Sequence, residues 1–198
     1  FRTEKHQGKW WLVDPEGRLF FSHGIDCVTP FEGKTPIDDR ARWFRGLPPQ
    51  DAEFKDCYSK ADWVVNGHYK GRQPACFDFG RANLIRKFGK DWAGGFGELA
   101  HRRLRSWGMN TIANWSSADT FLMKRTPYVV SIWFGGKQLE GSVGYWGKFR
   151  DVFDPSFEAE IRKWMATQKD KSAGDPWCIG YFVDNEVSWG DDDTALAV

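Results

Sequence analysis

The chain has 198 residues, enough for one ordinary domain or for part of a larger one. Its 28 Lys and Arg residues nearly balance its 27 Asp and Glu residues, which gives a formal net charge of +1. This balance argues against a nucleic-acid-binding domain that acts through bulk positive charge. The sequence has no run of about 18 apolar residues and no signal-peptide pattern after Phe1, so we expect neither a membrane partner nor a signal peptide in this chain.

Aromatic residues are unusually frequent. They make up 17% of the chain, and 12 of its residues are Trp. The flat apolar body of Trp, with its polar edge, suits the C–H face of a sugar ring. The composition therefore predicts a carbohydrate-binding cleft for some of these rings and a place in the core for the others.

The first predicted element is a β-hairpin with arms at 9–13 and 18–22. Between the arms, Asp14-Pro15-Glu16-Gly17 has the Pro and Gly placement of a type I turn. The second arm runs on to Val28, as one bent strand or as two strands in series. Its near-continuous apolar character predicts burial on both faces. From about 29 to 80, prolines and glycines interrupt any helical or strand periodicity of the apolar residues. This stretch is predicted to be a long aromatic-rich insertion and a candidate cleft wall.

Helices and strands alternate along the rest of the chain. Helices are predicted over the ranges 81–88, 95–107 and 119–124. A longer helix begins at Asp154-Pro155, with Asp154 as its cap, and ends at Gly174. Strands are predicted over the ranges 110–113, 128–133 and 178–183, the last of them buried. Four strands that alternate with helical regions predict an α/β fold built of parallel βαβ units.

The four cysteines, at positions 27, 57, 76 and 178, contain no C-x-x-C pair, which argues against zinc ribbons and thioredoxin-type sites. Cys27 and Cys178 lie in apolar runs and are predicted to be buried thiols. Cys57 and Cys76 lie in a polar stretch. They could form a disulfide with one another if the protein is secreted.

In parallel α/β folds, functional groups gather at the carboxyl ends of the strands. Polar residues follow three of the predicted strands: His23 and Asp26, then Asn114 and Trp115, then Asp184, Asn185 and Glu186. Glu186 is the leading candidate, because the sheet would fix its backbone while its carboxylate points out of the strand mouth. A half-buried, aromatic setting predicts a raised pKa for Glu186, as a general acid at neutral pH requires.

Other polar residues have weaker claims to function. Asp184 lies two residues before Glu186, on the same side of the strand, and is expected to be a structural acceptor. His23 is either a contact for a sugar hydroxyl or a buried, hydrogen-bonded residue. The remaining histidines are not grouped with Cys or carboxylates, so no metal site is expected. Asp191-Asp192-Asp193 is predicted to be a solvated loop rather than a calcium site.

Four motifs together resemble the β-agarase family of retaining glycoside hydrolases. The first motif is the range 10–17, which leads to Ser22-His23-Gly24. The second is 102–112, the third is Asn114-Trp115-Ser116, and the fourth is 181–186, which Trp189 follows closely. The Asn185-Glu186 pair is similar to the end of strand four in the clan of (β/α)8 retaining glycosidases. The β-galactosidase-like families of that clan are the next best match. The resemblance extends over nearly the whole chain.

The resemblance implies a role for each candidate residue. Glu186 is expected to be the catalytic acid/base, and Asn185 is expected to hold the hydroxyl next to the anomeric carbon. The expected substrate-binding residues are Asn185, His23, Asn114, Trp115 and Trp189. The implied substrate is a polysaccharide or oligosaccharide such as agarose, with no cofactor, no nucleic acid and a secreted or periplasmic location.

The expected fold is a partial (β/α)8 barrel. Residues 1–198 would form its N-terminal half, about four β/α units preceded by the β-hairpin, with the insertion at about 29–80. A complete barrel has eight strands and about 250 residues. The family's nucleophile, a Glu at strand seven, has no counterpart here, so we expect this chain alone to be inactive. The alternatives are a non-catalytic carbohydrate-binding protein with an aromatic cleft and, against the Trp content, an α/β protein unrelated to sugars.

Overall fold

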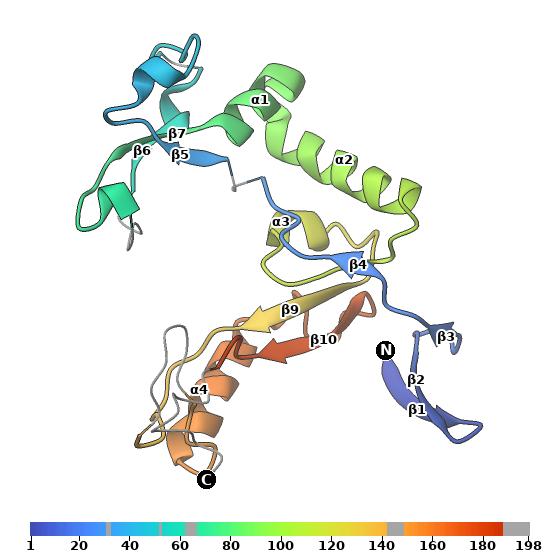
Figure 1. The fold of residues 1–198 in the computed structure, drawn as a ribbon. Coiled ribbons are helices and arrows are strands. Elements are labelled where there is room, and N and C mark those ends of the chain that lie inside the picture. Colours follow the sequence, from blue (N-terminus) through green and yellow to red (C-terminus); the bar gives the residue numbers. More distant parts are fainter. Residues whose placement is uncertain (31–32, 52, 62–66, 142–148, 188–198) are drawn as a thin grey trace. The chain divides into compact units, whose positions relative to one another are not determined.

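The computed structural model describes residues 1–30, 33–51, 53–61, 67–141 and 149–187 (Figure 1). The chain divides into two compact units. The first combines Phe1–Val28 with Arg103–Val198, and the second is Thr29–Arg102. No helix in the described part of the chain has both the length and the apolar run that crossing a membrane requires.

The first unit opens with a three-stranded antiparallel sheet in the order β1-β2-β3. Its strands are β1 (Arg2–His6), β2 (Lys9–Val13) and β3 (Leu19–Phe20). The predicted hairpin is confirmed, and the Asp14 carboxylate stabilises its turn by accepting the backbone N–H groups of Glu16 and Arg18, both at 2.9 Å. Strand β1 was not predicted, because a Gln7-Gly8 pair with positive φ angles of 49° and 78° makes the first turn in place of a common turn sequence.

A four-stranded parallel sheet follows, in the order β10-β9-β8-β4 (Figure 1). Its strands are β4 (Gly24–Ile25), β8 (Thr111–Ile112), β9 (Tyr128–Ile132) and β10 (Cys178–Val183). Within this sheet, each strand lies beside the sheet's next strand along the chain, and the parallel pairing confirms the predicted α/β class. Gly24 is required in β4, since a Cβ at this position would lie 1.9 Å from the carbonyl oxygen of Thr111.

The α-helices are α1 (Phe79–Phe88), α2 (Trp92–Ser106), α3 (Ala118–Phe121) and α4 (Pro155–Ala166). The predicted start of α4 is confirmed, because the Asp154 side chain accepts the N–H of Ser156 at 2.9 Å and Pro155 occupies the first turn. Its predicted end at Gly174 is wrong. The helix ends at Ala166, and the Thr167 hydroxyl then donates to the Trp164 carbonyl at 2.6 Å before a series of turns that closes at Gly174.

The core of the first unit lies between the parallel sheet and its helices. Its buried members are Leu104, Ile112, Phe121, Tyr128 and Val130. The rings of Phe121 and Tyr128 stack with centroids 4.6 Å apart. The Tyr128 hydroxyl donates to Asp175 at 2.8 Å, so this large residue is buried with its polar atom satisfied.

The second unit contains a small antiparallel sheet in the order β5-β7-β6. Its strands are β5 (Lys34–Pro36), β6 (Tyr58–Lys60) and β7 (Ala75–Asp78), and the short 3-10 turns are Ala41–Trp43, Lys55–Cys57, Gly67–Tyr69 and Gly89–Asp91. Phe54, Cys57 and Phe77 form its core with Ala82 and Ile85 of α1. Regular structure therefore exists within the stretch 29–80, but its strands of three or four residues are too short to show a period in the sequence.

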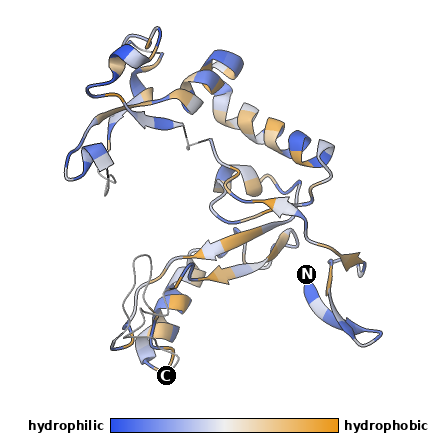
Figure 2. Ribbon diagram, viewed as in Figure 1, coloured by the Kyte–Doolittle hydropathy of each residue, from blue (hydrophilic) through white to orange (hydrophobic). Residues whose placement is uncertain are grey.

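The burial predicted for several apolar segments is wrong. Strand β10 was predicted to be buried, yet Phe182 is 53% and Val183 49% exposed, because β10 is an edge strand of the sheet. Figure 2 shows the apolar colouring of β9 and β10. The apolar stretch from the second arm of the predicted hairpin to Val28 divides into β3 and β4, which belong to two different sheets. Phe21, between these strands, is 80% exposed.

The cysteines depart in part from their predicted settings. Cys27 is exposed rather than buried, and its φ angle of +56° turns the chain just after β4. Cys178 is half-buried. Cys57 and Cys76 are both buried and form no disulfide with one another, and burial raises the pKa of each thiol.

Candidate active site

The carboxyl ends of the four parallel strands lie along one edge of the sheet. Because Val183 pairs with Ile132, the chain leaves β9 at Trp133 and leaves β10 at Asp184 in adjacent positions. Asn114 and Trp115 follow β8 at the same edge, and Asp26 follows β4. The sheet therefore brings together three of the predicted polar strand ends.

Glu186 lies three residues beyond the end of β10. The chain turns at Asp184, with a φ angle of +60°, and again at Glu186, with a φ angle of +48°. The side chain of Glu186 is exposed and that of Asn185 is half-buried. The prediction that the sheet fixes Glu186 in a half-buried setting is therefore wrong for the described residues, because the left-handed turn ends the strand first.

The same turn changes the position of Asp184. Side chains alternate between faces only within a strand, so the argument that put Asp184 and Glu186 on one side does not hold here. Burial raises the pKa of the Asp184 carboxyl, and the Arg150 guanidinium acts in the opposite direction. Among the described residues, no donor lies within hydrogen-bond distance of this carboxylate, so its expected role as a structural acceptor stays a prediction.

Arg150 is a neighbour of this turn that sequence reasoning missed. It donates to the Gly136 carbonyl at 3.5 Å, and its guanidinium lies 5.9 Å from the centre of the Phe134 ring. Its Nε atom is buried without a hydrogen-bond partner in the described part of the chain. An isolated Arg between two elements carries no motif, so only the structure could reveal it.

The loop after β8 holds Asn114 and Trp115 in a defined turn. The Asn114 carbonyl accepts the Cys27 N–H at 2.8 Å, and the Ser116 hydroxyl donates to the Ala113 carbonyl at 2.7 Å and accepts the Val28 N–H at 3.0 Å. Trp115 has a φ angle of +59° and is 42% exposed. The Oδ1 atom of Asn114 is buried, with no partner among the described residues.

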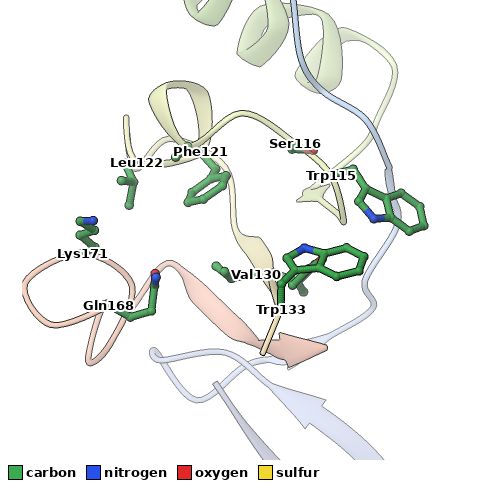
Figure 3. A pocket seen from close by; sticks show the side chains of 11 residues that line it. Trp115, Ser116, Phe121, Leu122, Val130, Trp133, Gln168 and Lys171 are labelled. Carbon is green, nitrogen blue, oxygen red and sulfur yellow. The ribbon is translucent and has the colours of Figure 1, made fainter. Parts of the chain in front are cut away.

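A pocket of about 260 Å³ lies beside this loop (Figure 3). Figure 3 shows the indoles of Trp115 and Trp133 near each other on one side, and Phe121, Leu122, Gln168 and Lys171 on the other. Trp133 is 60% exposed and was missed, because the third strand end is less polar than its neighbours. The two exposed rings offer apolar faces of the kind that a sugar ring contacts. Asn185 and Glu186 do not line this pocket.

The remaining predicted residues fall elsewhere. His23 precedes β4 and lies at the opposite end of that strand from Asp26, so its predicted place at a carboxyl end is wrong. Its backbone N–H donates to Asn110 Oδ1 at 2.8 Å, and its side chain is exposed. Trp189 and Asp191-Asp192-Asp193 lie outside the described residues. Within the described ranges, no three His, Cys, Asp or Glu side chains gather as metal ligands.

Comparison with known proteins gives two curated relatives from Vibrio sp. (strain JT0107). The chain is 36% identical to β-agarase B over 96% of its length and 29% identical to β-agarase A over 92% of its length. It spans 22% and 19% of those two proteins, or about a fifth of each. No family model matches the chain.

Solved structures give the same result. An exo-β-agarase superposes with a TM-score of 0.82 and 26% identity, covering 98% of this chain and 32% of that chain. The agarase AgWH50C superposes with a TM-score of 0.80 and 27% identity, covering 98% and 31%. In sequence and in fold, nearly the whole chain is therefore similar to one part of the β-agarases, which are glycoside hydrolases.

Proposed function

We propose that the chain forms the first part of the catalytic (β/α)8 barrel of a retaining β-agarase. One observation carries the proposal: β4, β8, β9 and β10 lie in the sheet in their order along the chain, and Asn185-Glu186 follows the fourth. A doubly wound sheet reverses its strand order at a switch point, whereas successive strands of a barrel stay neighbours. We place the stretch 29–80 as an insertion in the first β/α unit.

In the complete enzyme, Glu186 protonates the departing glycosidic oxygen and then takes a proton from the incoming water. A second carboxylate, about 5–5.5 Å away, forms the covalent glycosyl-enzyme. That nucleophile comes from a part of the enzyme beyond this chain. Asn185 holds the hydroxyl next to the anomeric carbon, while Asn114 contacts another hydroxyl.

The substrate is agarose or a related galactose-containing polysaccharide. Two features support a sugar-binding role for the loop after β8: the exposed indole of Trp115, and the buried Oδ1 of Asn114, which has no hydrogen-bond partner among the described residues. A sugar offers both a C–H face and hydroxyl donors. Trp189 is proposed to stack on another sugar. A polymer of this size stays outside the cell, so we propose a secreted or periplasmic enzyme that needs no cofactor and binds neither nucleic acid nor membrane.

The test is Glu186→Gln in the complete protein. Gln keeps the shape of the side chain but delivers no proton, so kcat on agarose should fall by at least about a hundredfold. The loss should be smaller for an aryl galactoside with a good leaving group, which needs less help from an acid. The matched control is Glu140→Gln, an exposed Glu in the loop after β9. Hydrolysis of agarose at the wild-type rate by Glu186→Gln would remove Glu186 from the mechanism.

A further inference from the structure

A surface of the second unit combines positive charge with an exposed aromatic ring. It is built from the segments 38–45 and 67–73, which contain five Arg or Lys residues and two Asp residues. The whole chain carries only +1, so positive charge is concentrated here. We call the part formed by Arg40, Arg42, Trp43, Tyr69 and Arg72 the Trp43 surface.

Three guanidinium groups surround two aromatic rings in the Trp43 surface. Arg40 lies 5.3 Å from the centre of the Trp43 ring and 4.6 Å from that of Tyr69. Arg72 lies 5.1 Å from the Tyr69 ring, and Arg42 lies 6.0 Å from the Trp43 ring. Tyr69 is 3% exposed and belongs to the core of this cluster, whereas Trp43 is 65% exposed. The indole therefore presents apolar area to solvent beside two cations.

The nearby carboxylates, Asp38 and Asp39, pair with Arg72 or with the backbone rather than with Arg40 or Arg42. Asp39 accepts from Arg72 at 3.0 Å and lies 3.6 Å from His68, and the Arg72 hydrogen bond, with His68, lowers the pKa of Asp39. Asp38 accepts the backbone N–H of Ala75 at 2.9 Å. In the described part of the chain, Arg40 and Arg42 have no carboxylate within ion-pair distance. Their charge is available to an external anion.

The cluster is held in place by the protein itself. The Asp38 carboxylate joins its segment to β7, and the Tyr69 hydroxyl donates to the Asp38 carbonyl. Arg42 donates to the Asp39 carbonyl at 2.8 Å, where Asp39 has a φ angle of +62°. These contacts order the two segments without a ligand, so less conformational entropy is lost when one binds.

We propose that the Trp43 surface binds a sulfated galactan. The Trp43 indole packs against the C–H face of a sugar ring, and the guanidinium groups of Arg40 and Arg42 hydrogen-bond the sulfate oxygens of the same chain. A single exposed ring beside a small cluster of cations fits one substituted sugar better than a run of stacked bases, and the chain lacks the charge of a nucleic-acid-binding domain. The inference deepens the proposed function, because it gives the enzyme a second, anion-selective contact with its polymer.

The experiment is native electrophoresis of the complete protein through gels that contain either a sulfated agar polysaccharide or neutral agarose. The double variant R42A/W43A should bind the sulfated polymer about tenfold more weakly, since it loses one charged hydrogen-bond donor and the stacking ring. Retardation of the double variant in the neutral agarose gel should change less than in the sulfated gel, since neutral agarose offers no sulfate to Arg42. The matched control is R105A/W107A, which removes an exposed Arg and a Trp that is 56% exposed outside this surface.

Binding of the sulfated polymer by R42A/W43A as tightly as by wild type would overturn the proposal. An equal loss of binding to the sulfated polymer in the control R105A/W107A would also overturn it. A third contrary result would be equal retardation of the wild-type protein in gels that contain dextran sulfate and in gels that contain duplex DNA. Either result would show that the protein responds to negative charge and does not recognise the sugar. The outcome is separable from that of the proposed function. If the wild-type protein does not cleave agarose, but R42A/W43A alone loses retardation by the sulfated polymer, the proposed agarase activity is wrong and the proposed role of the Trp43 surface is supported.

Discussion

Trp115 has a backbone conformation that is unusual for its residue type. A φ angle of +59° is rare for a bulky side chain, because it costs on the order of 1–3 kcal/mol and persists only where the surroundings enforce it. The Ser116 hydroxyl, bonded to Ala113 and Val28, enforces it here. The conformation sends the indole outward, beside Trp133. An outlier of this kind at a strand end is typical of a functional site.

Trp115→Ala should therefore weaken binding of agarose oligosaccharides and leave stability almost unchanged. The ring is 42% exposed, whereas truncating a fully buried aromatic ring costs about 3–5 kcal/mol. Affinity by calorimetry and melting temperature should be measured on the same preparations of the complete protein. Trp164→Ala is the control, since Trp164 packs on the core and contacts the Tyr181 ring. A large fall in melting temperature with unchanged affinity for Trp115→Ala would place the ring in the core instead.

The residue scale also shows where sequence reasoning stopped. Asn114 and Trp115 could be placed at a strand end, because an apolar run followed by polar residues is typical of the end of a buried strand. The exposure of Glu186 could not be predicted, since it depends on a left-handed turn at Asp184 that a non-glycine residue makes. The Arg40–Tyr69 contact joins segments almost 30 residues apart in sequence, and no local pattern records such a pairing.

At the scale of elements, long and strongly capped segments were predictable. The start of α4 and the bounds of β10 follow the sequence closely, because Asp154-Pro155 and a six-residue apolar run are strong local signals. Strands β5, β6 and β7 escaped prediction, since three or four residues hold too few alternations to define a period. Burial of β10 was predicted wrongly because an apolar composition does not say which strand lies at an edge.

One buried polar cluster joins two elements of the sheet. Asp175, before β10, accepts the Tyr128 hydroxyl of β9 at 2.8 Å and the Trp177 N–H at 3.1 Å, and it lies 3.3 Å from the Lys124 ammonium. Burial acts to raise the pKa of Asp175, but these hydrogen bonds and Lys124 outweigh it, so the pKa lies below its usual value. A carboxyl group with a lowered folded-state pKa stabilises the fold above its unfolded pKa.

Asp175→Asn should accordingly destabilise the protein by about 1–3 kcal/mol at neutral pH, because a buried charged acceptor with three partners is lost. The difference from wild type should shrink as the pH falls below about 4, where the carboxyl of the unfolded wild-type chain becomes protonated. Urea unfolding of the complete protein at pH 7 and near pH 3.5 measures both quantities. Asp119→Asn, at an exposed site, is the control. A difference that stays constant with pH would show that the charge of Asp175 contributes nothing.

At the scale of the whole molecule, the parallel sheet has two open edges. Among the described strands, β10 pairs only with β9, and β4 pairs only with β8. A barrel satisfies such edges by closing, whereas an open parallel edge leaves backbone N–H and C=O groups unpaired. Phe182 and Val183 of β10 are each about half exposed, so the edge is apolar as well.

These edges predict the behaviour of residues 1–198 expressed alone. The fragment should be inert toward agarose, because an acid/base without a nucleophile cannot complete double displacement. It should also aggregate or dimerise, since the apolar edge at Phe182 offers a surface for pairing with another copy. Light scattering and agarose assays on the purified fragment measure both outcomes. Phe182→Lys places a charge on the edge and should reduce association, while Phe153→Lys, at a 93% exposed site in the turn before α4, should not. A monodisperse, cooperatively melting monomer that cleaves agarose would contradict both the incomplete barrel and the two-carboxylate mechanism.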